Sequence, residues 1–545
     1  MLAILLGLAL LRAAAAASIA LNTTALSDGG WVLATFTLDT PGTASHFFTV
    51  HTPATANVSR IPPQPYPAEA PWLQSAAQKW ITCEALPGCL GHASFSYAFA
   101  IVNNFQTAAI HAFSGGLSAP VHLAASPAIT YAPSLATLPS RGHLGRTESL
   151  AEMNVTWWAP SAAQGYVKWG ASPSALTHHA PASAATYSQA DMCGAPATTM
   201  GWVQPFYWHT ATMAGLTPGS PAPVFYSYGS DALGWSQPAS FLPAPAPGAP
   251  TRLLLLADNG VTEPDGCQDH WDEPQASLTV QHMRDLINSG TGYDFSLIVH
   301  PGDVSYATGL LAKWATFTAR WAGVFDRVPY MVGQGNHERD FPGSHMEPSP
   351  FASSLDSGGE CGVVTNTIFP RSVEWRALAQ GVVHVVMLNS ELSVAEGSPQ
   401  YAWLQETLAA VDRAATPWSI VAFHRPLYFV DAEGGTRDKD FAPLEPLLVQ
   451  YAVDAVLVGH VHNAFVSCPL NDSKCVEPGQ GPVHICIGNA GQGITPISAT
   501  APPWVLFQKA AWGYSTLEAN ATHMAISLFG EGSASELWYT ARFTK

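Results

Sequence analysis

Seven residues with side chains suited to metal binding follow five short apolar segments of this chain. The segments are 252–257, 295–301, 329–335, 418–423 and 454–459. Each is continuous and bounded by turn-forming residues, as expected of a strand buried on both faces. The polar residues that follow them are Asp258, Asp303, Tyr306, Asn336, His424, His460 and His462. Because ligands bind beyond the carboxyl ends of strands in open α/β sheets, we expect these side chains to converge.

Oxygen and imidazole donors of this kind suit Fe(III), Zn, Mn or divalent Fe. No cysteine is among these candidate ligands, which argues against a structural zinc site. Asp303 can bridge two ions, one through each carboxylate oxygen. His460 and His462 are two residues apart at a strand end, so they can reach different ions. Two ions roughly 3.5–4 Å apart stabilise both the attacking and the leaving oxygen and lower the pKa of bound water. The pattern therefore predicts a dinuclear centre for phosphate ester hydrolysis.

In order and spacing, five sequence blocks resemble the metal motifs of the purple acid phosphatases, which are calcineurin-like metallophosphoesterases. The blocks are Asp258-Asn259-Gly260, Gly302-Asp303-Val304-Ser305-Tyr306, Gly335-Asn336-His337-Glu338, Val421-Ala422-Phe423-His424 and Gly459-His460-Val461-His462. The resemblance extends from about residue 154 to the C-terminus. Segments 191–197 and 356–362 look like those of a plant-type subgroup with an extra N-terminal domain, and some of its members resemble nucleotide pyrophosphatase/phosphodiesterases.

The resemblance implies a role for each ligand. Tyr306 distinguishes the purple branch, whereas other metallophosphoesterases usually carry a histidine at the position of Gly260. Fe(III) is implied at Asp258, Asp303, Tyr306 and His462. A divalent Zn, Mn or Fe is implied at Asp303, Asn336, His424 and His460.

His337 is implied to contact the phosphate or to protonate the leaving alcohol, a general acid role that typically contributes roughly 10²–10⁴-fold. Asn336, His337 and Arg425 are the candidate substrate contacts. Arg425 and Arg339 could clamp phosphate bidentately or pair with carboxylates. Glu338 could orient His337 or face solvent.

The chain departs from well-studied plant members beside two motifs. Residues 425–435 contain no histidine, and residues 463–468 lack the usual Tyr-Glu-Arg. Substrate preference is therefore open. We expect an acid phosphatase that hydrolyses phosphate monoesters with a metal-bound hydroxide. The alternatives are a nucleotide pyrophosphatase/phosphodiesterase using the same site and a catalytically weak or inactive metal-binding secreted protein.

The composition limits the partners. The 545 residues are 47% hydrophobic and 11% charged, which excludes a disordered chain. The net charge of −17 disfavours nucleic acid and anionic membranes. No apolar stretch is long enough to span a bilayer. We expect small phosphate esters or nucleotides as partners, no specific nucleic acid partner and no transmembrane segment. The oligomeric state is open.

The first 17 residues resemble a secretory signal peptide, although a basic n-region is missing and Arg12 interrupts the apolar stretch. Eight cysteines behind such a signal suggest disulfides, with Cys83–Cys89 and Cys468–Cys475 as possible local pairs. We therefore expect a secreted protein or one in the lumen of the secretory pathway. The candidate glycosylation sites are Asn22, Asn57, Asn154, Asn471 and Asn520.

Four regions follow the signal. Residues 18–135 and 142–242 are β-rich, with strand spacing in the second region typical of a fibronectin-III-like sandwich. A Pro/Ala/Gly linker at 243–250 precedes a catalytic domain over 251–545, in which strands alternate with helical segments. Residues 481–545 look β-rich again. The expected fold is thus N-terminal β-sandwich domains followed by an α/β metallophosphoesterase domain with mixed sheets between helices.

Overall fold

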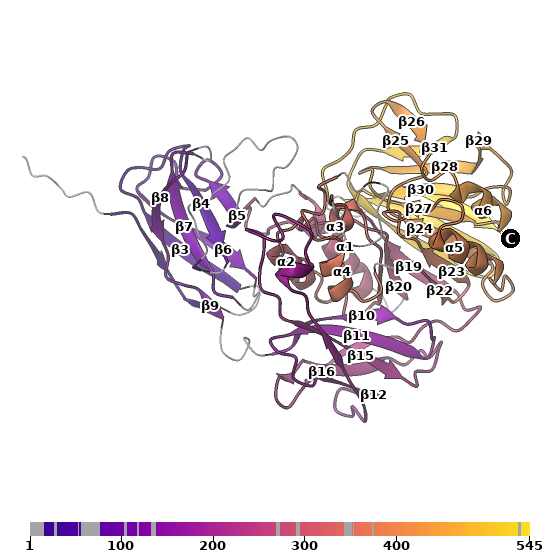
Figure 1. The fold of residues 1–545 in the computed structure, drawn as a ribbon, viewed down its shortest axis with the longest axis horizontal. Coiled ribbons are helices and arrows are strands. Elements are labelled where there is room, and N and C mark those ends of the chain that lie inside the picture. Colours follow the sequence, from indigo (N-terminus) through magenta and orange to yellow (C-terminus); the bar gives the residue numbers. More distant parts are fainter. Residues whose placement is uncertain are drawn as a thin grey trace, which may run out of the picture. The chain divides into compact units, whose positions relative to one another are not determined.

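The computed structural model describes residues 16–26, 30–52, 54–55, 77–102, 106–116, 119–131, 138–268, 273–289, 295–342, 351, 354–372, 375–531 and 536–545. Most of the predicted signal peptide and the candidate site Asn57 lie outside these residues. The chain divides into two compact units, of which the first comprises Met1–Ala132 with Asp265–Asp269 and the second comprises the remainder (Figure 1). No helix within the described ranges is long and apolar enough to cross a membrane.

The first unit is a β-sandwich. One sheet has the order β1 (Ser18–Leu21), β3 (Gly30–Thr37), β6 (Ser94–Ile101). The other has the order β5 (Ala77–Thr82), β4 (Phe47–His51), β7 (Ala109–Ser114), β8 (Val121–Ala125), and β2 (Ala25–Leu26) pairs with β9 (Thr130–Tyr131). Alternate residues of β3 such as Phe36 pack against Val50 and Ile110 of the second sheet in one core, as the period of two in a half-buried strand requires.

A short segment from beyond the linker completes this unit. The backbones of Gln268 and Trp80 exchange two hydrogen bonds, and Lys79 Nζ lies 2.6 Å from Asp265 Oδ2. Both charged side chains are buried, so each neutralises the other in a place where a lone charge would be costly. The segment that follows the first metal motif is therefore anchored in the N-terminal unit.

Acidification is expected to destabilise the first unit through buried histidines. His51 is fully buried against His111, with 4.9 Å between ring centroids, and neither ring nitrogen of His51 has a hydrogen-bond partner among the described residues. Burial, and then the charges of His111 and His122, lower the pKa of His51 to about 3. An unfolded chain takes up this proton below about pH 6.5, so stability falls as the pH drops from there toward 3, by about 2 kcal/mol at pH 5.

Denaturant titrations of the full chain at pH 7 and pH 5 measure this loss. His51→Gln should reduce it, whereas His92→Gln, an exposed histidine of the same unit, should leave it unchanged. An equal loss in wild type and His51→Gln would contradict the assignment.

The second unit begins with another sandwich. Its sheets have the orders β10 (Ser140–Arg146), β11 (Glu152–Ala159), β15 (Tyr207–Ala214), β14 (Ser183–Ala185) and β13 (His178–Pro181), β12 (Tyr166–Gly170), β16 (Val224–Ser230), β17 (Gly234–Trp235), with β18 (Ala239–Phe241) on β16. Trp157, Val167 and Tyr226 pack between the sheets. This sandwich contacts the catalytic domain, because Tyr226 Oη donates to the Asp326 carbonyl at 2.8 Å.

Two mixed sheets form the catalytic domain. The first has the order β21 (Tyr330–Val332), β20 (Leu297–His300), β19 (Thr251–Leu255), β32 (Gly513–Ala519), β33 (His523–Gly530), β34 (Glu536–Thr544). The second has the order β22 (Arg376–Gln380), β23 (Val383–Met387), β24 (Trp418–Phe423), β27 (Ala455–Val458), β30 (Val483–Ile487), β28 (Ala464–Asn471), β29 (Lys474–Cys475), with β31 (Val505–Lys509) on β28. A β25 (Tyr428–Asp431) and β26 (Gly434–Arg437) hairpin stands apart. The expected combination of β-sandwiches and an α/β catalytic domain is confirmed.

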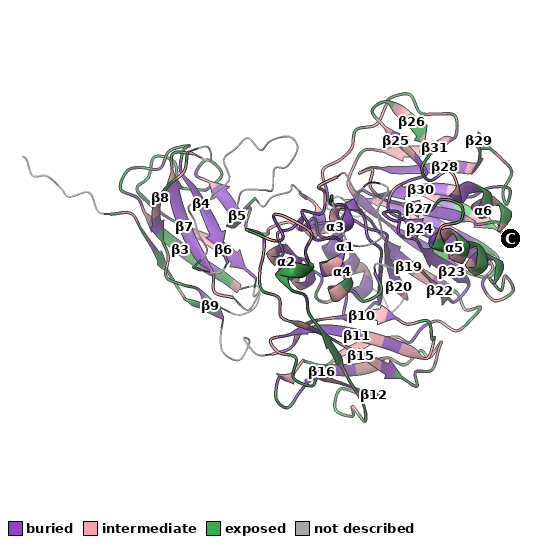
Figure 2. Cartoon of the chain, in the orientation of Figure 1, coloured by how far each residue is buried: buried purple, intermediate pink, exposed green. Residues whose placement is uncertain are grey.

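Apolar side chains from both sheets form one core between them, for example Leu255, Val299 and Ile420. On the other face of the second sheet, Val421 and Val456 pack against α5 (Pro399–Ala409) and α6 (Leu444–Gln450). Figure 2 shows the buried strands β24 and β27 beside the exposed outer side of α5. Strands with apolar residues on both faces are buried on both faces, as their continuous apolar sequences predict.

The remaining helices are α1 (Ala276–Asn288), α2 (Ala312–Arg320), α3 (Asn336–Arg339) and α4 (Val363–Ile368), with a 3₁₀ turn at Gln189–Asp191. Within each sheet the metal-motif strands run parallel: β19 with β20, β20 with β21, and β24 with β27. Their carboxyl ends therefore lie along one edge of each sheet. All five predicted strands preceding the metal motifs are present.

Candidate metal centre

Each predicted ligand lies within six residues of the end of its strand; Asn336 begins α3, and the others lie in loops. Asp258, Asp303, Tyr306 and His460 have positive φ values of 58°, 51°, 49° and 67°. Non-glycine residues rarely adopt this conformation, and it concentrates at functional sites where surrounding structure holds it. Gly302, at φ 145°, permits the close approach of two turns, because a Cβ there would lie 2.6 Å from the Gly335 nitrogen.

Asp258, Asp303 and His462 form the first of two ligand groups. Tyr306 joins it, with Oη 3.2 Å from Asp258 Oδ1 and 3.0 Å from His462 Nε2. The Nδ1 of His462 lies 2.8 Å from the Gly493 carbonyl, which makes Nδ1 the donor and leaves Nε2 to face the site. These four residues are those implied for the ferric ion.

The second group consists of Asp303, His424 and His460. Asn336 Oδ1 lies 2.9 Å from His424 Nε2 and 3.0 Å from His460 Nδ1, and Asp303 Oδ1 lies 3.2 Å from His424 Nε2. Asp303 is common to both groups. The structure thus brings all seven predicted ligands together, in the two sets implied by the resemblance.

The buried charges make this region attractive to cations. Burial opposes ionisation of Asp303, but His424 and His337 outweigh it and hold the pKa of this carboxyl well below its usual range. Burial favours neutral His424, but Asp303 raises the pKa of this imidazole to about 9. Burial and the neighbouring Asp258 raise the pKa of Tyr306 well above its usual value. A bound cation would displace the proton of His424 and would lower the pKa of Tyr306.

The donors fit two metal ions. Within each group the ligand atoms lie within 4.8 Å of one another, and all are carboxylate oxygens or imidazole nitrogens. Tyr306 adds a phenol to the first group, and Asn336 adds an amide oxygen to the second. Hard oxygen donors with imidazoles suit iron, zinc and manganese.

His337 borders the second group without belonging to it. Its Nε2 lies 3.9 Å from Asp303 Oδ2, and its Nδ1 lies 3.2 Å from the Asp356 carbonyl. The carbonyl only accepts, so Nδ1 carries a proton and Nε2 faces the centre. This arrangement suits a residue that acts on a ligand of the metals rather than on the metals themselves.

Arg425 is held by two buried carboxylates. Its Nε donates to Glu391 at 2.7 Å and its Nη2 donates to Asp340 at 3.0 Å, while Nη1 lies 3.3 Å from His460 Nε2. Burial opposes its charge, but these carboxylates raise the pKa of Arg425 further above its usual value. Arg425 as a phosphate contact stays a prediction, and Arg339 is buried.

Glu338 neither orients the His337 side chain nor faces solvent. Its carboxylate accepts from the backbone nitrogens of Asp303, Val304 and Gly335 at 2.9, 2.8 and 3.0 Å. It therefore ties together the turns that carry Asp303 and Asn336. This role could not be predicted from sequence, because it depends on how the segments that carry Asp303 and Asn336 approach each other in the folded chain.

Segment 356–362 also contributes to the centre. Asp356 contacts Asn336 and His337, while Glu360 accepts from the Gly309 nitrogen at 2.8 Å. A disulfide joins Cys361 to Cys193. The two local pairs, Cys83–Cys89 and Cys468–Cys475, are also present, and Cys486 is a buried free thiol.

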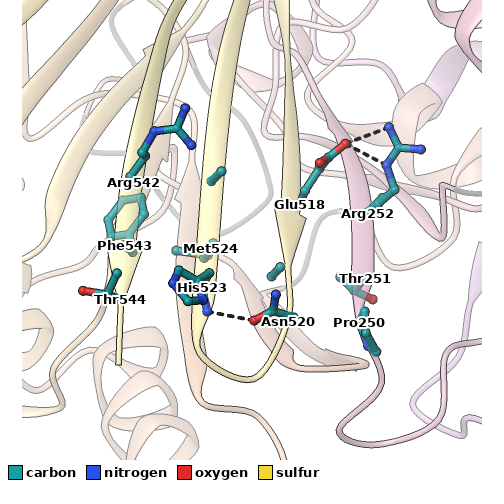
Figure 3. Close-up of a pocket in the computed structure, with 12 residues that line it drawn as sticks. Pro250, Thr251, Arg252, Glu518, Asn520, His523, Met524, Arg542, Phe543 and Thr544 are labelled. Carbon is teal, nitrogen blue, oxygen red and sulfur yellow. Dashed lines mark hydrogen bonds and ion pairs between the residues drawn. The ribbon is translucent and has the colours of Figure 1, made fainter.

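A separate pocket of about 600 Å³ lies at the opposite end of the first sheet (Figure 3). Pro250 and Arg252 line it at the start of β19, whereas Asp258 follows the end of that strand. Figure 3 shows Arg252 paired with Glu518 and Asn520 in the turn before His523. None of the predicted metal ligands lines this pocket.

Comparison with known proteins agrees with the fold. The calcineurin-like phosphoesterase family matches residues 251–464, which defines the catalytic domain as a metallophosphoesterase. The N-terminal domain of purple acid phosphatases matches residues 139–242, their Fn3-like domain matches residues 15–133, and the iron/zinc purple acid phosphatase-like C-terminal region matches residues 481–534.

The chain belongs to the purple acid phosphatase family. It is 31% identical over 480 residues to "Probable inactive purple acid phosphatase 27" of Arabidopsis thaliana, covering 83% of this chain and 76% of that protein. It is 32% identical to a nucleotide pyrophosphatase/phosphodiesterase of Hordeum vulgare, covering 52% of this chain and 81% of that protein.

Among solved structures, the purple acid phosphatase PPD1 of yellow lupin (Lupinus luteus) superposes with a TM-score of 0.88 at 27% identity, covering 97% of this chain and 96% of that one.

Proposed function

We propose that this chain is an acid phosphatase that hydrolyses phosphate monoesters at a dinuclear Fe(III)–M(II) centre. The observation that carries the proposal is the convergence of seven ligands from five strand ends in two groups that share Asp303. Two adjoining cation sites with a bridging carboxylate suit in-line displacement at phosphorus.

Asp258, Asp303, Tyr306 and His462 would hold the ferric ion, and Asp303, Asn336, His424 and His460 would hold Zn, Mn or divalent Fe. When bound, such a pair of ions neutralises phosphate charge and supplies a nucleophile at mild pH. His337 would act on the ester. Because Nδ1 keeps its proton toward the Asp356 carbonyl, the proton given to the leaving alkoxide would be the one that the imidazolium form carries on Nε2.

A nucleotide pyrophosphatase/phosphodiesterase is the second candidate. The barley relative with that name, which aligns over 81% of its own length, favours it. Residues 425–435 lack the histidines found in well-studied plant members. Substrate preference would then depend on other residues near Arg425.

Initial rates on three esters test the proposal and rank the candidates. The purified full chain is supplied with iron and with zinc or manganese at mildly acidic pH. Faster hydrolysis of p-nitrophenyl phosphate than of bis(p-nitrophenyl) phosphate or ATP supports the monoesterase. Preference for the bis-ester or ATP supports the second candidate. No release from any ester would defeat both, and the inactive metal-binding protein would then be the better description.

Replacing Tyr306 with phenylalanine is expected to remove a visible absorption band. A phenolate bound to Fe(III) gives a charge-transfer band, and Tyr306 is the phenol at the centre. The metal-loaded wild type should absorb in the green-yellow range, while Tyr306→Phe should not, and metal analysis should accompany both spectra. Tyr187→Phe, a buried tyrosine of the sandwich region, is the matched control. A colourless iron-loaded wild type would contradict the ferric assignment.

We also propose that the chain enters the secretory pathway. The three disulfides support an oxidising compartment. Among the candidate glycosylation sites, Asn22, Asn471 and Asn520 are exposed, whereas Asn154 is partly buried and accepts from Thr212 Oγ1 at 2.8 Å. Secretion of the full chain from a eukaryotic host, with a mass that falls on treatment with a glycosidase, would test this; cytosolic retention would contradict it.

A further inference from the structure

Asn336 must present one particular end of its amide to the divalent site. Its Oδ1 faces His424 Nε2 and His460 Nδ1 at 2.9 and 3.0 Å. The other end, Nδ2, donates to Asp356 Oδ2 at 2.8 Å. An amide has an acceptor end and a donor end of nearly the same size, and only the oxygen can bind a cation. Sterics alone therefore do not select the orientation.

An ionised carboxylate does select it. Asp356 can only accept, so it pairs with the NH₂ end of Asn336 and turns the oxygen toward His424 and His460. The reverse orientation would place two oxygens against each other and would point N–H groups at the metal. The hydrogen bond to a charged acceptor also polarises the amide and strengthens its oxygen as a donor to a cation.

The backbone around Asp356 is fixed independently of this contact. The Ser357 nitrogen donates to the Asp340 carbonyl at 3.0 Å, and the Cys193 nitrogen donates to the Gly359 carbonyl at 2.8 Å. The Cys193–Cys361 disulfide ties the same segment to the sandwich region. Gly358 at φ 57° allows close packing, because a Cβ there would lie 1.9 Å from the Thr308 carbonyl oxygen. Asp356 thus extends from a rigid support.

We infer that Asp356 is a positioning residue for the divalent metal site, acting through the amide of Asn336. Its carbonyl separately fixes the tautomer of His337, through the 3.2 Å contact with Nδ1. Substitution of the Asp356 side chain removes the contact with Asn336 and leaves the contact between the Asp356 carbonyl and His337. The inference rests on the proposed function, since Asn336 must be a metal ligand.

Divalent metal affinity is the direct readout. Zn²⁺ or Mn²⁺ is titrated into the iron-loaded full chain, and bound metal is counted by elemental analysis. Asp356→Ala should weaken divalent binding by about 10- to 100-fold, the usual effect of losing a partner that orients a ligand. Asp356→Asn keeps an acceptor but is uncharged and can also present its own NH₂ end, so its divalent affinity should lie between those of wild type and Asp356→Ala. The iron content should be the same in all three proteins.

The same Asp356 substitutions made in an Asn336→Asp variant distinguish a positioning role from general structural support. Asn336→Asp replaces the amide by a carboxylate whose two oxygens are equivalent, so no orientation has to be selected. In this background Asp356→Ala should not weaken divalent binding and should strengthen it, because two facing carboxylates repel each other. A merely structural role would weaken binding equally in both backgrounds. Asp356→Leu, which keeps the branching at Cγ without an acceptor, gives the same comparison if the alanine variant fails to fold.

The outcomes distinguish the two proposals. If wild type binds two metals and hydrolyses phosphate esters while Asp356→Ala keeps wild-type divalent affinity, the role of Asp356 is overturned and the proposed function stands. An equal weakening in the wild-type and Asn336→Asp backgrounds also overturns it. If wild type binds no second metal, both proposals fail together.

Discussion

Replacing Asp303 with asparagine is expected to abolish phosphate ester hydrolysis, with a fall of at least about 10³-fold, equivalent to roughly 4 kcal/mol of lost stabilisation. Asp303 is the residue shared by both ligand groups. Asparagine keeps one oxygen, so it can neither bridge two ions nor offset their charge. It also tolerates the φ of 51° at this position, so the loss would reflect chemistry rather than backbone strain.

Rates on p-nitrophenyl phosphate, measured together with metal content, test this expectation. Asp303→Asn should retain fewer than two metals at concentrations that saturate wild type. Asp285→Asn on the exposed side of α1 is the matched control and should behave as wild type. Activity within about tenfold of wild type in Asp303→Asn would mean that the bridge is not needed, and the dinuclear mechanism would be wrong.

The ligands of the centre could be predicted from sequence because each lies shortly after a buried strand and within a motif that resembles those of a known family. A continuous apolar run fixes a strand, the strand fixes its carboxyl end, and parallel neighbours bring those ends to one edge. The same reasoning placed β24 at Trp418–Phe423, where the structure has it. The positions of the ligands and of the strands before them were thus encoded in short-range sequence pattern, whereas the order of strands in each sheet was not predicted.

The supporting contacts could not be predicted, because they depend on long-range packing. Asp356 is 20 residues from Asn336, and Asp340 is 85 residues from Arg425; neither follows a strand. The Cys193–Cys361 disulfide spans 168 residues, which no local spacing reveals, whereas the pair six residues apart at Cys83–Cys89 is readily anticipated. The buried ion pair of Lys79 with Asp265 likewise joins residues 186 positions apart, so no local pattern predicts it.

His337→Ala is expected to slow hydrolysis of an alkyl ester such as glycerol 2-phosphate by roughly 10²–10⁴-fold while slowing p-nitrophenyl phosphate by less than about tenfold. An alkoxide leaves poorly without a proton, whereas p-nitrophenolate leaves readily without one. The geometry supports the donor role, since Nε2 lies 3.9 Å from Asp303 Oδ2 beside the metal ligands while the Asp356 carbonyl retains the proton on Nδ1.

The comparison of kcat and KM for both esters decides between the two roles open to His337. A proton donor changes kcat selectively for the poor leaving group. A phosphate contact is made equally by both esters, so its loss would raise KM or lower kcat by the same factor for each. Equal losses on the two substrates would therefore overturn the general acid role and assign His337 to phosphate binding. His179→Ala, an exposed histidine of β13, is the control and should alter neither rate.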